Sequence, residues 1–182
     1  MSPSAGALNQ CLLMGSDYFI IPTFPDYYCY LAVHSLSKVL PRWNQEIIPL
    51  RGADIAYSFP NEYPKFLGII SQRYRPINKA PAASYQQWID KIDDAVKKSL
   101  VPILENSKML LKSQDYNLKN IADFNTLIAQ SQKHNVPIFS LSDEQIEKQG
   151  IVLANMKESR DDFLKTFQEL AKTVITKIEG NN

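Results

Sequence analysis

The sequence predicts an α/β protein in which an incomplete, doubly wound and mostly parallel sheet is flanked by helices. Short apolar runs bounded by turn residues alternate with longer segments whose apolar residues recur every three or four positions. Strands that alternate with helices in this way are typical of parallel sheets. Hydrophobic residues make up 45% of the chain and charged residues 21%, as in ordinary folded proteins. We therefore expect a single α/β domain over residues 1–182.

A short helix and then a strand are expected at the start of the chain. Ser4 has the side chain of an N-cap, and Gly15 is a typical residue to end a helix. The helix would bury three leucines on one face: Leu8, Leu12 and Leu13. Residues 17–22 follow as a short apolar run, which suits a strand that is covered on both faces.

A second helix is expected to complete a first segment over residues 1–43. Asp26 is its predicted N-cap, directly after Pro25. Its buried stripe would hold Leu31, Leu36, Val39 and Leu40. Pro41 is expected to disturb this helix near Trp43, because proline lacks the backbone N–H group that a helix interior needs.

Residues 44–64 are predicted to form an insertion loop on the surface. Prolines and a glycine break every helical or strand period in this segment: Pro49, Gly52, Pro60 and Pro64. A strand is then expected over residues 65–73, with its buried part in residues 66–70. Residues 75–81 would form an exposed turn after it.

Later core strands and helices are expected up to residue 141, followed by C-terminal helices over residues 142–182. An amphipathic helix from about Ser84 would bury Trp88, Ile92, Ala95 and Val96. Residues 101–104 and 136–141 are predicted as strands, and residues 121–131 as a helix with Phe124, Leu127 and Ile128 inward. Residues 142–145 have the pattern of a helix start, and Met156–Lys177 of a long helix. Its stripe would hold Phe163, Phe167, Leu170, Val174 and Ile178.

Charge and hydropathy exclude several classes of protein. The formal net charge is +1, which excludes a strongly basic or acidic molecule. No apolar run approaches the roughly 20 residues that cross a bilayer, and the start of the chain lacks the basic residues of a secretory signal. We expect a soluble, cytoplasmic protein. Cys11 and Cys29 lie in apolar surroundings and are predicted to be buried, reduced thiols.

Common catalytic motifs are also missing from the sequence. With six glycines, it contains neither GxxxxGK[ST] nor GxGxxG, so no phosphate-binding loop is present. No GxSxG, HExxH or clustered metal-ligand pattern occurs either. His34 and His134 are far apart in the sequence and are interpreted as structural or solvated. The residues alone therefore predict neither a catalytic group nor a metal site.

Two stretches near the start carry a more specific signal. Residues 2–10 are Ser-Pro-Ser-Ala-Gly-Ala-Leu-Asn-Gln, and residues 16–23 are Ser-Asp-Tyr-Phe-Ile-Ile-Pro-Thr, with Pro-Asp-Tyr at 25–27. This order resembles the middle of ParA-type ATPases, the deviant P-loop family that includes MinD and Soj proteins. Residues 66–75 and the Val-Pro pair at 101–102 resemble its later core strands, so the likeness covers about residues 2–104.

The resemblance implies a P-loop NTPase-like fold of which this chain is the C-terminal part. Pro3, Ser4 and Asn9 would belong to the switch II region. The Walker A lysines and the carboxylate that help to hold ATP and Mg²⁺ in the family would lie before Met1. Because phosphoryl transfer depends on these groups, we expect this chain alone to bind neither cofactor and to be inactive as an ATPase.

The resemblance also implies contacts with adenine and with DNA. Gln72 and Pro102 would lie beside adenine, as ligands do at the carboxyl ends of parallel strands, with an ordinary strand end as the alternative. Members of the family bind DNA non-specifically as ATP-bound homodimers. Four basic residues in a segment without acidic residues are the candidates for DNA contacts: Lys65, Arg73, Arg75 and Lys79. A solvated turn is the alternative for this cluster.

Two functions of different classes follow from these observations. The first is the C-terminal portion of a ParA-type ATPase, which couples ATP binding and hydrolysis to dimerisation and to DNA or partner binding, as in plasmid or chromosome partition. The alternative is a non-catalytic interaction or regulatory module that retains the ATPase scaffold. An aromatic set is expected in the core, but any part left uncovered would favour a partner or a dimer: Tyr18, Phe19, Phe24, Tyr27, Tyr28 and Tyr30.

Overall fold

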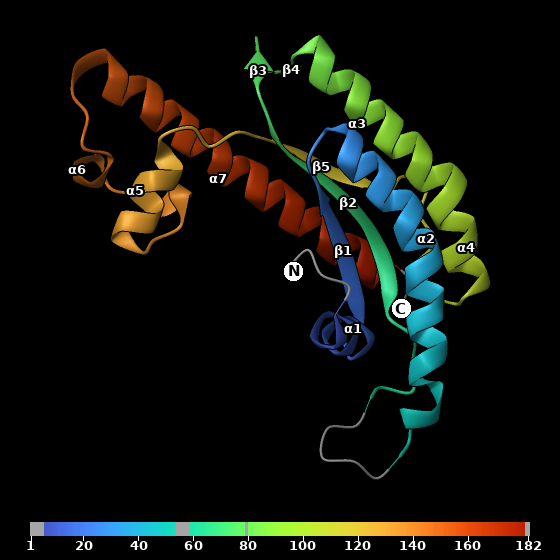
Figure 1. The fold of residues 1–182 in the computed structure, drawn as a ribbon. Coiled ribbons are helices and arrows are strands. Elements are labelled where there is room, and N and C mark those ends of the chain that lie inside the picture. The colour runs from blue at the N-terminus through green and yellow to red at the C-terminus, as the bar shows by residue number, and fades with distance from the viewer. Residues whose placement is uncertain (1–5, 54–58, 79, 181–182) are drawn as a thin grey trace.

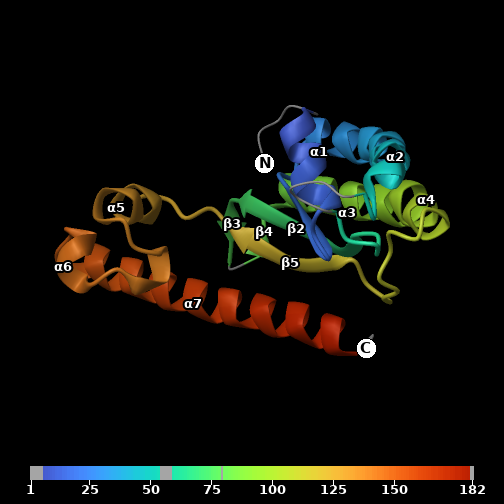
Figure 2. The same cartoon turned by 90° about the horizontal axis from the view of Figure 1, so that it is seen from below.

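A computed structural model of the chain describes residues 6–53, 59–78 and 80–180. A three-stranded parallel sheet lies at the centre between two layers of helices (Figure 1; Figure 2). The strands are β1 (Tyr18–Thr23), β2 (Lys65–Tyr74) and β5 (Asn117–Ala122), in the order β1-β2-β5. Because all three strands are parallel, their carboxyl ends lie at one edge of the sheet. The expected α/β class with a parallel sheet between helices is confirmed.

The first helix, α1 (Ala7–Met14), is confirmed and ends at Gly15. Its expected N-cap, Ser4, lies outside the described residues. The predicted buried face is wrong in part, because Leu8 is 72% and Leu12 58% exposed. The side that faces the core instead carries Asn9, Leu13 and Met14. Leu13 lies about 100° around the helix from Leu12, so the two cannot share one narrow buried face.

The second helix, α2 (Tyr27–Ile47), begins at the predicted N-cap. The carboxylate of Asp26 accepts a hydrogen bond of 2.7 Å from the backbone N–H of Cys29. The helix continues through Pro41, contrary to prediction, because Leu40, Trp43 and Ile47 are buried in the main core on both sides of the proline. The insertion loop is correspondingly shorter and starts with the 3₁₀ turn η1 (Ile48–Leu50).

The connection from β2 to β5 is helical almost throughout, and the strand predicted over residues 101–104 is wrong. After a small exposed hairpin of β3 (Pro76–Ile77) and β4 (Ala80–Pro81), the chain forms α3 (Ala83–Ala95), the π-helical turn η2 (Val96–Leu100) and α4 (Val101–Asn106). Leu100 and Leu104 are both fully buried at helical spacing. The π turn accommodates Pro102, because its wider winding relieves the clash of the proline ring with the preceding turn.

Between residues 117 and 141 the predicted order of elements is also wrong. The third strand is β5, whereas the helix α5 (Leu127–His134) starts later than expected and residues 136–141 contain only the 3₁₀ turn η3 (Ile138–Ser140). Only Leu118 and Ile121 of β5 are buried, so the strand lacks the continuous apolar run that marked the other two. Pro137 precedes η3 and lacks the N–H group that a sheet ladder would use.

The last two helices confirm the C-terminal prediction. Ser142 and Gln145 form a complete capping box at the start of α6 (Asp143–Ile146). The long helix α7 (Gly150–Glu179) includes the predicted residues 156–177. Its stripe faces the protein, with Phe163 buried and the other four side chains half-buried: Phe167, Leu170, Val174 and Ile178.

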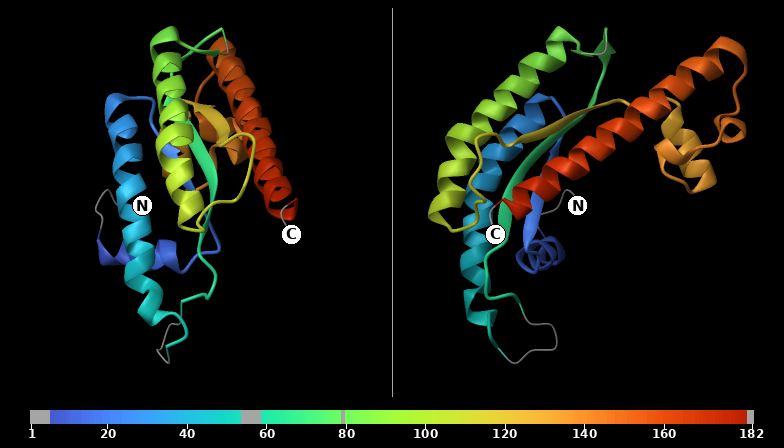
Figure 3. Two further views of the ribbon diagram at one scale, coloured as in Figure 1. Left: turned by 90° about the vertical axis from the view of Figure 1, so that its right-hand side faces the viewer. Right: turned by 180° about the vertical axis from the view of Figure 1, so that it is seen from behind.

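Two hydrophobic clusters hold these elements together. The main cluster lies between the sheet and the layer of α2, α3 and α4. The second joins Ile121 of β5 to α5, η3, α6 and α7 on the other side of the sheet. Figure 2 and Figure 3 show α7 running along this face and extending beyond the sheet to α5 and α6. Among the described residues, no helix is long and apolar enough to span a membrane.

The two cysteines differ from the prediction of buried thiols. Both are free, but Cys11 is exposed and Cys29 is half-buried. The backbone N–H of Phe24 lies 3.2 Å from the Cys29 sulfur, and burial raises the pKa of this thiol. Cys11 is exposed because it lies with Leu8 and Leu12 on the side of α1 that turns away from the core.

Candidate functional site

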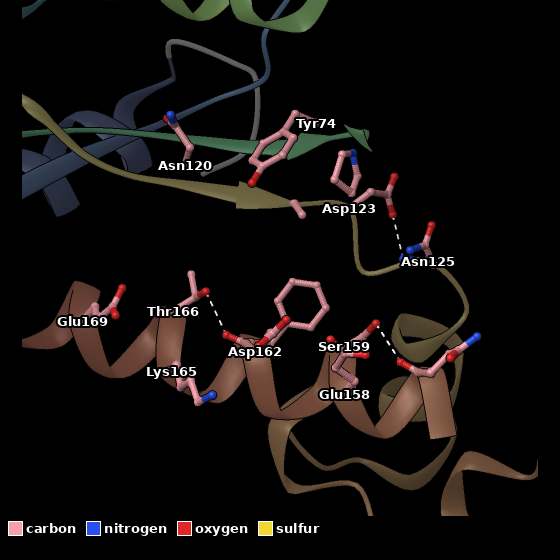
Figure 4. Close-up of a pocket in the computed structure, with 14 residues that line it drawn as sticks. Tyr74, Asn120, Asp123, Asn125, Glu158, Ser159, Asp162, Lys165, Thr166 and Glu169 are labelled. Atoms are coloured by element: carbon pink, nitrogen blue, oxygen red, sulfur yellow. Dashed lines mark hydrogen bonds between the residues drawn. The ribbon is translucent and has the colours of Figure 1, made fainter. Parts of the chain in front are cut away.

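A cavity of about 500 Å³ lies between the carboxyl ends of β2 and β5 and the middle of α7 (Figure 4). Ligands of α/β proteins bind outside the carboxyl ends of parallel strands, so the position itself suggests a binding site. The sheet side is formed mainly by Tyr74, Asn120, Ala122 and Asp123. Helix α7 contributes the opposite wall, which includes Glu158, Asp162, Phe163, Thr166 and Glu169.

A bulge at the end of β2 directs Tyr74 toward the cavity. The register with β5 shifts between Gln72 and Tyr74, and the residue between them, Arg73, has a φ of 64°. A bulge of this kind bends the strand and re-aims the following side chain. Figure 4 shows the Tyr74 ring directed toward α7. Burial raises the pKa of the Tyr74 phenol, so the hydroxyl stays neutral and can donate a hydrogen bond.

The loop after β5 is fixed by local hydrogen bonds. The backbone N–H of Asp123 donates to the carbonyl of Tyr74 over 2.9 Å, which ties the loop to the end of β2. The Asp123 carboxylate in turn accepts from the backbone N–H of Asn125 over 2.8 Å. Asn125 has a φ of 49°, a left-handed conformation that asparagine tolerates better than most residues. Backbone hydrogen bonds and the left-handed conformation of Asn125 therefore fix the polar wall at this end of the cavity.

The α7 wall presents mainly hydrogen-bond acceptors. The hydroxyl of Thr166 donates to the carbonyl of Asp162 over 2.9 Å, and that of Ser159 donates to the carbonyl of Asn155 over 3.0 Å. Each hydroxyl has thus used its proton within the helix, and its oxygen lone pairs remain as acceptors. Glu169 pairs with Lys119 of β5 over 2.5 Å, and the hydrogen bond from Lys119 lowers the pKa of this carboxyl.

The charge of the lining is unfavourable for phosphates. Among the described residues, four carboxylates line the cavity, from Asp123, Glu158, Asp162 and Glu169, against one ammonium, that of Lys165. Its apolar surface comes largely from the rings of Tyr74 and Phe163, both at most 8% exposed. The described lining therefore offers apolar surface and hydrogen-bond acceptors, and disfavours a group with several negative charges.

The two residues predicted beside adenine lie at opposite ends of the sheet. Gln72 is half-buried near the carboxyl end of β2, where it pairs with Ile121. Pro102 is exposed in α4, after a helix that has run back to the amino end of β2 (Figure 1). The expectation that Pro102 ends a parallel strand is wrong, because residues 101–104 are helical. Neither residue lines the cavity.

The residues assigned to switch II also lie away from the cavity or outside the described residues. Asn9 is buried in α1, which lies at the amino end of β1 (Figure 1). Pro3 and Ser4 lie outside the described residues. The structure therefore places only Asn9 of this set, and places it at the far end of the sheet.

The three described candidates for DNA contacts, Lys65, Arg73 and Arg75, do not form one cluster. Lys65 begins β2 and donates to the carbonyl of Lys108 over 2.8 Å. Arg73 is eight residues further along the same strand, a distance of roughly 26 Å at 3.3 Å per residue. Arg73 and Arg75 are exposed together at the carboxyl end, and Lys79 lies outside the described residues.

The aromatic set near the start is divided between the core and the surface. Phe19 is buried against Phe66, with 5.3 Å between the ring centroids. Tyr27 and Tyr28 are exposed at the start of α2. Tyr27 also contacts the ring of Trp88 on α3 at 6.0 Å. The expectation of a core role is thus correct for Phe19 and wrong for Tyr27 and Tyr28.

The sequence pattern does not identify the residues that line the cavity as a site. Asp123 and Asn125 were placed within a predicted helix, although an Asp-x-Asn sequence after an apolar pair is also typical of a loop that follows a strand. Asp162 and Thr166 lie off the predicted apolar stripe of α7, and nothing in their spacing distinguishes a cavity wall from a solvated face.

Among the described residues, no group of three or more histidine, cysteine, aspartate or glutamate side chains is arranged to hold a metal ion. Comparisons of the chain with protein-family models, with curated proteins and with solved structures found no match. The cavity and its lining are therefore the observations on which a functional assignment rests, together with the motifs in the sequence.

Proposed function

We propose that this chain is the base-binding portion of a ParA-type ATPase, and that the cavity between β2, β5 and α7 holds the adenine nucleoside. The observation that carries the proposal is the position and lining of this cavity at the carboxyl ends of two parallel strands. By resemblance to the family, the longer protein would couple ATP binding and hydrolysis to homodimerisation and to DNA or partner binding.

The shape and polarity of the lining support a nucleobase. The rings of Tyr74 and Phe163 offer apolar surface for a flat heterocycle. Asp162 supplies an acceptor for an exocyclic amino group such as that of adenine. The Tyr74 hydroxyl and the side-chain amides of Asn125 and Asn155 supply donors for the nitrogen atoms of the base ring. These groups would recognise the base without any contribution from a phosphate-binding loop.

The acidic lining also restricts where the phosphates lie. Within the described lining, a triphosphate would approach several carboxylates and one lysine. The proposal therefore places the phosphates outside the cavity, where the family's phosphate-binding residues would complete the site. Hydrolysis requires those residues and Mg²⁺, so this chain by itself is proposed to bind adenosine and to leave ATP intact.

Calorimetric titration of the purified chain with adenosine, guanosine and ATP, with phosphate release followed in parallel, tests this proposal. We expect adenosine to bind more tightly than guanosine, and ATP not to bind detectably, because its phosphates would approach the acidic lining. Asp162→Asn should weaken adenosine binding about tenfold, because it removes a charged acceptor from the cavity. The matched control is Asp161→Asn, whose side chain lies outside the lining and pairs with Arg160. Absence of adenosine binding, or turnover of ATP, would contradict the proposal.

The exposed tyrosines favour a second candidate function, that of a non-catalytic interaction module. Tyr28 is 78% exposed, and Tyr27 and Leu31 lie exposed beside it on α2. Exposed aromatic side chains of this kind are enriched at protein interfaces. A monodisperse protein that binds no nucleoside, and that self-associates unless Tyr27 and Tyr28 are replaced by serine, would support this candidate in place of the first.

A further inference from the structure

Helix α7 is fastened to the sheet through its carboxyl-terminal half. Glu169 pairs with Lys119 of β5 over 2.5 Å. One turn from the end of the helix, the ammonium of Lys177 donates to the Ser113 hydroxyl over 2.7 Å and to the carbonyl of Asp115. The same ammonium lies 5.5 Å from the centroid of the Tyr116 ring. These contacts attach the carboxyl-terminal half of α7 to β5 and to the segment before it.

The amino-terminal half of α7 is fastened to a different part of the protein. We call residues 127–146, which contain α5, η3 and α6, the C-terminal cap. Asp143 of the cap pairs with Lys157 over 2.6 Å and with Arg160 over 3.1 Å. Arg160 also donates to the carbonyl of Leu141 over 2.9 Å. Phe163 shares a hydrophobic cluster with Leu127, Ile138, Leu141 and Ile146 of the cap.

The cavity spans parts of both sets of contacts. Its α7 wall runs from Asn155 to Glu169, and its other wall is the end of β2 and β5. Figure 2 shows the helix running continuously from the sheet to the cap. A helix of this length transmits displacement along its axis better than a loop does, because every turn is hydrogen-bonded to the next. A ligand that contacts both walls would therefore restrain the sheet, α7 and the cap together.

We propose that α7 couples occupancy of the cavity to the rigidity of the C-terminal cap. The identity of the ligand rests on the proposed function, whereas the coupling itself rests on the contacts of α7. A ligand shifts the balance between a rigid and a loosened cap only by the difference in its affinity for the two states. Contact with both walls of the cavity supplies that difference. The cap contributes no residue to the cavity lining, so any effect of a ligand on the cap must pass through α7 or the loop after β5.

Hydrogen exchange of the full chain, with and without saturating adenosine, tests the effect of the ligand. We expect adenosine to slow exchange in the middle of α7 and, by at least about threefold, in the cap. Protection confined to the cavity walls would overturn the coupling. Absence of any adenosine binding would overturn the proposed function, and the coupling would then be decided by the variants that follow.

A variant without ligand tests the coupling independently of nucleotide binding. Lys119→Met removes the ion pair that holds Glu169 to the sheet but leaves every contact of the cap in place. We expect exchange in the cap to be at least about threefold faster in this variant. Lys98→Met is the matched control, because it removes the exposed pair with Asp94 on the opposite helical layer. Unchanged exchange of the cap in Lys119→Met would overturn the proposal.

Discussion

The hydroxyl oxygens of Thr23 and Ser71 lie 3.2 Å apart at paired positions of β1 and β2, and both side chains are buried. Thr23 also donates to the carbonyl of Ile70 over 3.3 Å. The Thr23 proton is thus used on the carbonyl, so Ser71 is the donor in the pair. The two residues form a short chain of hydrogen bonds that satisfies buried polar groups near the carboxyl ends of both strands.

Thr23→Val is expected to lower the free energy of unfolding by about 1–3 kcal/mol, because it leaves the Ser71 hydroxyl buried without its acceptor. Ser71→Ala should cost less, since Thr23 keeps its bond to Ile70. The double variant should be no less stable than Thr23→Val alone. Denaturant unfolding of all four proteins measures the coupling, and additive effects of the two substitutions would contradict the hydrogen-bond chain.

Gly68 lies at a bulge of β2 where a side chain has no room. Its φ is +149°, and an added Cβ would lie 2.4 Å from the carbonyl oxygen of Tyr116 and 2.9 Å from Cγ of Leu118. Gly68→Ala is therefore expected to lower the free energy of unfolding by about 2–4 kcal/mol through overpacking and backbone strain. Chemical denaturation gives the value.

Gly52→Ala is the control for this substitution. Gly52 also has a positive φ, of +74°, but no atom of the residues that the structure describes lies within 4 Å of an added Cβ. Only backbone strain remains, at about 1 kcal/mol. Equal losses in the two variants would show that the close approach of Tyr116 to β2 does not constrain residue 68.

Asp26 caps α2 next to the carboxyl end of β1. Its carboxylate accepts a 2.7 Å hydrogen bond from the Cys29 N–H. Asp26→Ala is expected to lower the free energy of unfolding by about 0.5–2 kcal/mol. Asp26→Asn should retain most of this stabilisation, because asparagine is an equally good N-cap. Thermal unfolding followed by circular dichroism compares the two variants. A loss as large in Asp26→Asn as in Asp26→Ala would argue against the cap.

The parts of the fold that could be predicted from sequence are those with a strong local pattern. The apolar runs that form β1 and β2, and the N-cap residue Asp26 at the start of α2, led to correct predictions of these elements. The third strand could not be recognised, because β5 alternates Leu118 with lysine and asparagine and is stabilised by pairing with β2. Pro41 and Pro102 misled the prediction for a related reason, since burial of their helices outweighs the local cost of a proline.

The cavity could not be predicted because its walls are far apart in the sequence. Tyr74, Asp123 and Asp162 come from three elements, and only the tertiary arrangement brings them together. The same arrangement separates Gln72 from Pro102, which the resemblance to ParA-type ATPases implied at adjacent strand ends. The spacing of apolar residues within one element could therefore identify the helices, but not a cavity whose walls come from different elements.

The cap should loosen in acid through Asp143. The hydrogen bond from Lys157, followed by that from Arg160, holds the pKa of this carboxyl below its usual value of 3.8. A carboxyl with a depressed pKa in the folded state stabilises that state above its unfolded pKa, and the contribution is lost as the pH falls through the folded value. Asp143→Asn should therefore speed hydrogen exchange of α6 at neutral pH, and its difference from the unmodified chain should shrink below about pH 4. Lys157→Met, which removes the main partner, should reproduce the effect in part. A difference that stays constant down to about pH 2 would exclude this ion pair as the source of acid sensitivity.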